Sequence, residues 1–183
     1  NVAIGAMHAI NKHGLKKILI VDWDLHHGNG TQHSFDDDPR VLYFSTHQYP
    51  YYPGTGSLQE IGRGKGEGYT INVPLSTGAD DAAFVKIFRK ILQPAALQYK
   101  PDFVLLSAGF DTYFQDPLGG MRVTPKGFAA LTRIMLDIAD SCCEGRLVVV
   151  LEGGYHVMGL AESIKAVLEE MRGDTVCTEE RLA

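Results

Sequence analysis

Three stretches of aliphatic residues predict the buried strands of a parallel sheet. They cover residues 17–22, 103–108 and 146–151. Nearly unbroken runs of this kind are typical of strands buried on both faces, whereas a half-exposed strand alternates apolar and polar positions. Two further runs, 41–45 and 69–73, predict additional strands.

The segments between these strands have apolar residues at helical spacing. Gly14 and Gly145 are natural helix stops, Thr124-Pro125 is a favourable helix start, and Pro94 is expected to kink or restart the helix that precedes it. The predicted helices cover 1–13, 80–92, 124–143 and 158–172, with a short helical turn at 31–35. Strands alternating with helices predict a three-layer α/β/α fold around a mainly parallel sheet.

Polar side chains follow the three strongest strands. Asp24 and His26 follow the first, Asp111 the second and Tyr155 the third, with Asp22 one step deeper in the first. Parallel sheets place ligands at the carboxyl ends of their strands, so these groups are expected to meet at one edge. Because alternate residues of an extended chain share a side, Asp24 and His26 can face one point. Two carboxylates and one imidazole suit a divalent cation, most commonly zinc, and leave a position open for water and substrate.

Each of these residues also has a structural interpretation. Acids after a strand often cap the next helix, and adjacent histidines often only form hydrogen bonds in loops. Asp111 alone fits a turn cap, and Tyr155 alone fits a core or surface tyrosine. Their occurrence together at three strand ends favours a shared site.

Four motifs resemble those of the zinc-dependent histone deacetylase superfamily, which has the arginase/deacetylase fold. The central motif is 22–32, D-W-D-L-H-H-G-N-G-T-Q, and its Trp and its N-G-T-Q ending are nearer the class II and bacterial members. The others are Y-P-G-T-G at 52–56, G-F-D at 109–111 and E-G-G-Y at 152–155. The resemblance extends from residue 1 to about residue 172.

The resemblance implies specific roles within these motifs. One zinc ion per chain would be held by Asp24, His26 and Asp111, and Tyr155 would be the catalytic oxyanion donor. The substrate tunnel would be lined by Tyr52, Leu118, Gly153 and Gly154. A structural potassium ion would be held by Asp22 and Ser45, together with backbone carbonyls of Asp24 and His26.

The sequence departs from the family pattern at its start. The family's general base and acid are adjacent histidines upstream of the opening helix, and this chain begins after that point, at Asn1. We therefore expect 1–183 to be a single, partial catalytic domain that lacks the N-terminal part of the fold and ends in a polar tail at 174–183. His47 and His156 are the only in-chain substitutes for the base. Such a chain should bind zinc, hydrolyse acetyl-lysine poorly and expose an apolar sheet edge that favours homo-oligomers.

Composition excludes several classes of partner. The chain has 17 Lys and Arg against 22 Asp and Glu, a net charge of −5, which predicts no binding to nucleic acid or to an anionic membrane. No apolar run approaches the roughly 20 residues of a membrane helix, and no signal peptide is visible. Three cysteines without a C-x-x-C pattern predict a reducing, cytoplasmic setting.

Three functions fit these observations. The first is zinc-dependent hydrolysis of an N-acetyl amide, acetyl-lysine or acetylpolyamine. The second is a non-catalytic scaffold that binds acyl-lysine and keeps the fold and the metal, although such a protein has less need of Tyr155. The third is a two-metal ureohydrolase of the arginase type, which would need additional carboxylate ligands that the sequence does not obviously supply.

Overall fold

A five-stranded parallel sheet forms the centre of the molecule. The computed structural model describes residues 1–174, and the strand order is β3-β2-β1-β4-β5. The strands are β1 (Ile18–Asp22), β2 (Val41–Gln48), β3 (Thr70–Leu75), β4 (Phe103–Ala108) and β5 (Leu147–Leu151). The three strands followed by candidate site residues, β1, β4 and β5, are neighbours, so their carboxyl ends meet at one edge as predicted.

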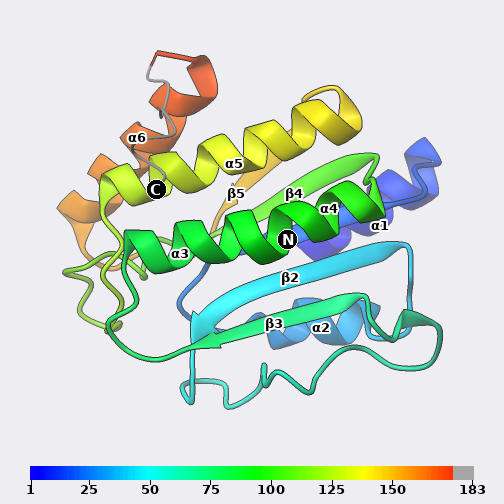
Figure 1. The fold of residues 1–183 in the computed structure, drawn as a ribbon, viewed down its shortest axis with the longest axis horizontal. Coiled ribbons are helices and arrows are strands. Elements are labelled where there is room, and N and C mark those ends of the chain that lie inside the picture. Colours follow the sequence, from blue (N-terminus) through cyan, green and yellow to red (C-terminus); the bar gives the residue numbers. More distant parts are fainter. Residues whose placement is uncertain (175–183) are drawn as a thin grey trace.

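Helices cover both faces of this sheet (Figure 1). One face packs against α3, α4, α5 and α6 around a large apolar cluster, and the other packs against α1 and α2 around a smaller one. The helices are α1 (Val2–His13), α2 (Asn29–Phe35), α3 (Asp81–Ile87), α4 (Gln93–Tyr99), α5 (Pro125–Cys143) and α6 (Val157–Arg172), with a 3-10 turn at Gly64–Gly66 and a π-helical segment at Phe88–Leu92. The structure therefore has the predicted three-layer α/β/α arrangement, and within residues 1–174 no helix is long and apolar enough to span a membrane.

Local sequence signals set the ends of these helices. The Asp80 carboxylate accepts a hydrogen bond from Ala83 N–H at the start of α3, and the Thr124 hydroxyl accepts one from Gly127 N–H at the start of α5. Gly14 ends α1 in the left-handed region, with φ of 69°. Pro94 lies in the first turn of α4, directly after the π-helical segment, so the helix continues past the expected break by changing its hydrogen-bonding pattern.

Two strands differ from their sequence-based predictions. β3 contains Pro74 instead of ending before it, which is possible because β3 lies at the edge of the sheet, where a missing N–H is tolerated. The prediction of a buried strand at 146–151 is wrong, because among residues 1–174 β5 pairs only with β4, and Val148 and Leu151 are about half exposed, at 45% and 53%. Self-association through this edge stays a prediction.

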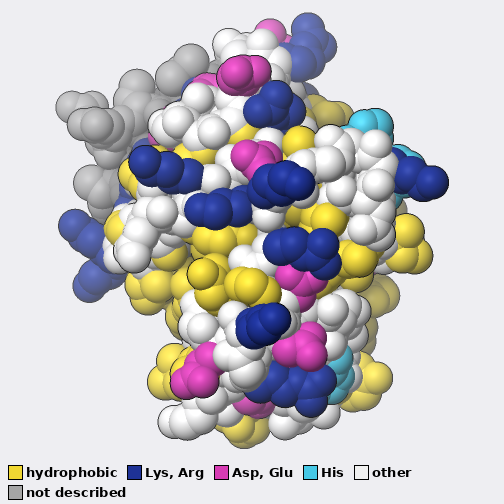
Figure 2. All heavy atoms as spheres, turned by 90° about the vertical axis from the view of Figure 1, so that its right-hand side faces the viewer, with side chains coloured by type: hydrophobic (Ala, Val, Ile, Leu, Met, Phe, Trp, Pro, Cys, Tyr) yellow, Lys and Arg dark blue, Asp and Glu magenta, His cyan; other side chains and the backbone are white. Residues whose placement is uncertain are grey.

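The surface at the amino-terminal ends of the strands carries basic, acidic and apolar side chains (Figure 2). Figure 2 views the amino-terminal ends of the strands, where Lys and Arg side chains alternate with acidic and apolar ones. The candidate site lies at the carboxyl ends and is therefore on the other side. The predicted polar tail 174–183 lies outside the described residues except for Asp174, and so does Cys177.

Aromatic packing beneath the site makes a large contribution to stability. Phe128 on α5 is fully buried, and its ring lies 4.9 Å from that of Phe110 and 5.9 Å from that of Trp23. We expect Phe128→Ala to lower the free energy of unfolding by about 3–5 kcal/mol in urea titrations. Phe114→Ala, at a 45% exposed position, is the matched control and should cost about 1 kcal/mol or less. Equal losses in both variants would contradict this account of the core.

Candidate metal centre

The backbone after β1 curls around two carboxylates. Asp22 Oδ1 accepts a hydrogen bond from Asp24 N–H at 3.0 Å, and Asp24 Oδ1 accepts one from His26 N–H at 2.8 Å. Side chains of Asp commonly form such bonds two residues along the chain. We predicted that Asp24 and His26 face one point because the chain stays extended. They do converge, but through these two turns, since the strand ends at Asp22.

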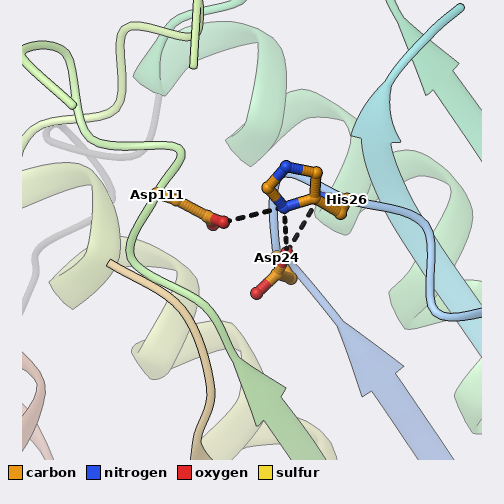
Figure 3. Close-up of side chains that lie close together, drawn as sticks. All are labelled: Asp24, His26 and Asp111. Carbon is orange, nitrogen blue, oxygen red and sulfur yellow. Dashed lines mark hydrogen bonds and ion pairs between the residues drawn. The ribbon is translucent and has the colours of Figure 1, made fainter. Parts of the chain in front are cut away.

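Asp111 joins this pair from the end of β4. Its Oδ2 lies 3.0 Å from Nδ1 of His26, and Oδ1 of Asp24 lies 3.2 Å from the same nitrogen (Figure 3). One candidate ligand atom from each of the three side chains lies within 4.8 Å of the others. The structure therefore brings together the three residues proposed from the sequence as metal ligands, and it identifies Nδ1 as the His26 atom that faces the carboxylates.

The charges in this cluster favour a cation between the carboxylates. Contacts with the Asp111 and Asp24 carboxylates raise the pKa of the His26 imidazole to about 10. Burial raises the pKa of the Asp111 carboxyl, and the nearby Asp24 carboxylate raises it further, while the contact with His26 opposes this. Two carboxylates held this close to each other and to a nitrogen are stabilised by a positive charge among them.

Two glycines allow the backbone to approach the cluster. A Cβ on Gly109 would overlap the Asp24 carboxylate, and a Cβ on Gly153 would lie 2.7 Å from Asp111 Oδ2 and 3.1 Å from Asp24 Oδ2. Gly153 N–H also donates a hydrogen bond to Asp24 Oδ2 at 3.3 Å. These contacts come from the ends of β4 and β5 and hold the carboxylates in place.

The donor set fits a divalent metal ion. Asp111 Oδ2 is buried and accepts no hydrogen bond of normal geometry, although buried carboxylate oxygens usually have a donor. Asp111 Oδ1 accepts a hydrogen bond from Leu25 N–H at 2.9 Å, which fixes the side chain so that Oδ2 points into the cluster. One nitrogen and two carboxylate oxygens are common zinc ligands, and a set of three leaves coordination positions open.

Tyr155 lies on the loop between β5 and α6. Gly154 precedes it with φ of 135°, a conformation that side chains rarely adopt, and the Tyr155 side chain is 54% exposed. Partial burial raises the pKa of the Tyr155 phenol, and the Asp111 and Asp24 carboxylates raise it further. The phenol is therefore protonated at neutral pH and can act as a hydrogen-bond donor.

Aromatic and apolar side chains lie beside the cluster. The Tyr52 ring is 6.1 Å from the His26 ring, and its side chain is 76% exposed. Tyr51, which we did not predict, stacks on His26 at 5.7 Å and donates a hydrogen bond from its hydroxyl to the Leu118 carbonyl at 2.7 Å. Tyr51 therefore connects the loop that contains Tyr52 with Leu118. The tyrosines at 49–52 indicated an aromatic loop near the site. Their sequence did not show which of them contacts His26.

Comparison with known proteins identifies the family. The model of the histone deacetylase domain matches residues 1–171. The chain belongs to the histone deacetylase family.

This chain is similar to several named proteins in sequence and in structure. Histone deacetylase 14 of Arabidopsis thaliana, a chloroplastic protein, is 44% identical over 174 residues, and polyamine deacetylase HDAC10 of Homo sapiens is 47% identical over 180 residues. These alignments cover 95% of the chain but 41% and 26% of the two relatives. The crystal structure of the HDA15 HD domain superposes with a TM-score of 0.89 at 41% identity, covering 99% of the chain and 52% of that domain. The chain thus spans less than half the length of both curated relatives.

Three further histidines of this chain have ring nitrogens in contact with other groups. His47 is buried, its ring nitrogens contact Ser45 Oγ and the Gly56 carbonyl, and burial lowers its pKa to about 4. The His27 ring contacts Thr55 and Gln32. His156 caps α6 by accepting a hydrogen bond from Gly159 N–H. The two substitutes named from the sequence, His47 and His156, thus both have a ring nitrogen engaged with another part of the chain.

Asp22 and Ser45, the candidate potassium ligands, lie side by side on β1 and β2. The two residues are paired in the sheet register, and both are buried. Burial raises the pKa of the Asp22 carboxyl well above its usual range, and the Asp24 carboxylate adds to this. The Tyr43 hydroxyl donates a hydrogen bond to Asp22 Oδ2, and within residues 1–174 Asp22 has no ion pair with Lys or Arg.

Proposed function

We propose that this chain carries the metal site of a zinc-dependent deacetylase that hydrolyses an N-acetyl amide. The convergence of Asp24, His26 and Asp111 within 4.8 Å is the observation that carries the proposal. The family membership supports the same reaction class, since the relatives are named as histone and polyamine deacetylases. One metal ion per chain is expected, because the described cluster has three ligands and not the larger carboxylate set of a two-metal site.

The residues of the site divide the chemistry between them. Asp24, His26 and Asp111 would hold the ion, which when bound would polarise an acetyl carbonyl and acidify a water molecule. Tyr155 would donate its phenolic hydrogen to the carbonyl oxygen as negative charge develops there, and a preorganised donor of this kind contributes about 2.7–4 kcal/mol. Gly153 and Gly154 would allow the tyrosine loop to approach the substrate closely.

The wall beside the cluster suits an unbranched apolar stem. Tyr51, Tyr52 and Leu118 are all partly or largely exposed and lie on the two loops that flank His26. Acetyl-lysine and acetylpolyamines share a linear chain of methylene groups next to the acetamide. Both substrate classes therefore fit the proposal, with the acetyl group at the metal and the stem against these residues.

Slow turnover that imidazole accelerates is the expected behaviour of the 183-residue chain. A water on an ion that has two carboxylate ligands would be less acidified than in a three-histidine site, so a general base is needed. The rings of His27, His47 and His156 have hydrogen-bonding partners outside the cluster. We expect kcat on a fluorogenic acetyl-lysine amide to lie well below the roughly 10 s⁻¹ typical of enzymes. Added imidazole should raise this rate by about 10-fold or more by acting as the missing base.

The same assay separates an enzyme from a scaffold. The rescued activity should require zinc and should fall about 100-fold or more in Tyr155→Phe, since one oxyanion donor is lost. The zinc content is measured in parallel, because imidazole also binds zinc. Rapid turnover without imidazole would contradict the lack of a base. Zinc-loaded chain that releases no acetate even with imidazole would instead support the non-catalytic acyl-lysine-binding alternative.

We also propose a structural potassium ion at Asp22 and Ser45, with the Asp24 and His26 carbonyls as further ligands. The support is the buried Asp22 carboxylate, which has no basic partner among the described residues. We expect the melting temperature to fall by about 5–10 °C when choline replaces potassium at a concentration of about 100 Kd. Asp22→Asn should remove this difference. Equal melting temperatures of the unmodified chain in the two salts would refute the site.

A further inference from the structure

Asp116 connects two loops that border the metal centre. It lies between β4 and α5, and its side chain is buried, with 6% exposure. Its Oδ1 accepts a hydrogen bond from Leu118 N–H at 2.9 Å. Its Oδ2 accepts two from the next loop, from Tyr155 N–H at 2.7 Å and His156 N–H at 3.2 Å. One carboxylate therefore fixes the backbone of both the wall residue and the candidate oxyanion donor.

A local turn explains only one of these three hydrogen bonds. The bond from Leu118 N–H to Oδ1 spans two residues and is an ordinary Asp turn. The Oδ2 bonds reach 39 and 40 residues along the chain, where no local turn requires them. Within residues 1–174 Asp116 forms no ion pair with Lys or Arg, so main-chain N–H groups satisfy this buried charge. Such charge-assisted bonds are shorter and stronger than neutral ones.

The connection continues to the aromatic wall. Tyr51 donates its hydroxyl hydrogen to the Leu118 carbonyl, and its ring stacks on the ligand His26. Leu118 is thus held from two sides, by Tyr51 through its carbonyl and by Asp116 through its N–H. The loops at 49–56, 112–123 and 152–156 therefore form one hydrogen-bonded rim around the site, and Asp116 is the member that reaches Tyr155.

We propose that Asp116 is a positioning residue that acts through Tyr155: it holds the phenol of Tyr155 and the wall at Leu118 in fixed relation to the metal centre. This inference rests on the proposed deacetylase function for the role of Tyr155. Asp116 itself contacts main chain and not substrate. Tyr155 is 54% exposed and follows a glycine with a positive φ, so the Asp116 bonds to the Tyr155 and His156 N–H groups limit the motion of its backbone.

Asp116→Asn is the most informative variant. An amide has one acceptor oxygen, so either Leu118 N–H or the Tyr155 and His156 N–H groups lose their partner. The first readout is amide hydrogen exchange in the metal-free chain. Exchange should accelerate by about 10-fold or more either at the Leu118 amide or at the Tyr155 and His156 amides, while amides of β1 and β4 stay protected. Asp116→Glu keeps the charge but shifts it by one methylene, and it should show a smaller acceleration.

The second readout is acetate binding to the zinc-loaded chain. The carboxylate of acetate is a product that can accept the Tyr155 hydrogen bond, so Tyr155→Phe should weaken its binding by about 10-fold. Asp116→Asn should weaken it several-fold in the unmodified chain and should have no further effect in Tyr155→Phe, because it acts through that hydroxyl. The matched control is Asp102→Asn, which alters another carboxylate that accepts two main-chain bonds, from Lys16 and Lys17, at the far end of β4.

The outcomes distinguish this inference from the proposed function. The positioning role would be overturned if the effects of Asp116→Asn and Tyr155→Phe on acetate affinity were fully additive. It would also be overturned if Asp116→Asn left amide exchange at Leu118, Tyr155 and His156 unchanged. An effect of Asp102→Asn on acetate binding as large as that of Asp116→Asn would overturn it too, by showing a general loss of stability. If the unmodified zinc-loaded chain binds no acetate, the proposed function fails. The exchange data still test whether Asp116 restrains the loop at 152–156.

Discussion

Asp111→Ala is expected to weaken zinc binding by at least about 100-fold. The loss should exceed the 10–100-fold caused by removing an outer partner of a metal ligand, because Asp111 Oδ2 is a direct candidate ligand. The substitution also leaves Leu25 N–H without its acceptor, which costs about 1–3 kcal/mol of stability. Competition with a chromophoric chelator measures the zinc affinity.

Two further variants separate metal binding from folding. Asp111→Asn keeps an acceptor for Leu25 N–H but removes the negative charge, so it should fold and still bind zinc far more weakly. Asp37→Ala removes an exposed carboxylate in the turn after α2, and its zinc affinity should equal that of the unmodified chain. Unchanged zinc affinity of Asp111→Ala would show that the ion, if any, binds elsewhere.

Gly109→Ala is expected to have the second largest effect on zinc binding. Its Cβ would overlap the Asp24 carboxylate, which contacts backbone on both sides and has little room to move. We expect zinc affinity to fall by about 10-fold or more, because ligands must be held close to their productive positions. Crowding in a packed region should also lower stability by roughly 1–3 kcal/mol.

Gly30→Ala provides the matched control. Gly30 belongs to the same predicted family motif as Asp24, but it lies in α2, and no atom lies within 4 Å of the position its Cβ would take. Alanine there should leave zinc affinity unchanged and should stabilise the helix by about 0.5–1 kcal/mol. If Gly109→Ala binds zinc as tightly as Gly30→Ala, the carboxylate of Asp24 is not held by this close approach.

The sequence predicted the elements of this fold because local signals agreed with its tertiary structure. The aliphatic runs that became β1 and β4 are buried on both faces, as their composition indicates, and Thr124 caps α5 where the Thr-Pro pair predicted its start. β5 has the same aliphatic composition but lies at a sheet edge. Composition describes the residues of a strand and not its neighbours, so it could not distinguish these cases.

The convergence of Asp24, His26 and Asp111 was predictable from the sequence, whereas the contacts of the neighbouring loops were not. Asp24, His26 and Asp111 follow strand ends, and parallel topology brings such ends together. Tyr51 forms one hydrogen bond, and Asp116 two, to loops that are distant in sequence, and no periodicity or spacing marks such bonds. Loop conformation is decided by these individual contacts, which become visible only in the folded structure.

A crystal structure of the zinc-loaded chain, with anomalous diffraction at the zinc edge, tests the central claim most directly. We predict a single zinc peak per chain, about 2.0–2.2 Å from one carboxylate oxygen each of Asp24 and Asp111 and from Nδ1 of His26. A peak bound by other residues, or two peaks sharing these carboxylates, would contradict the single-metal deacetylase site.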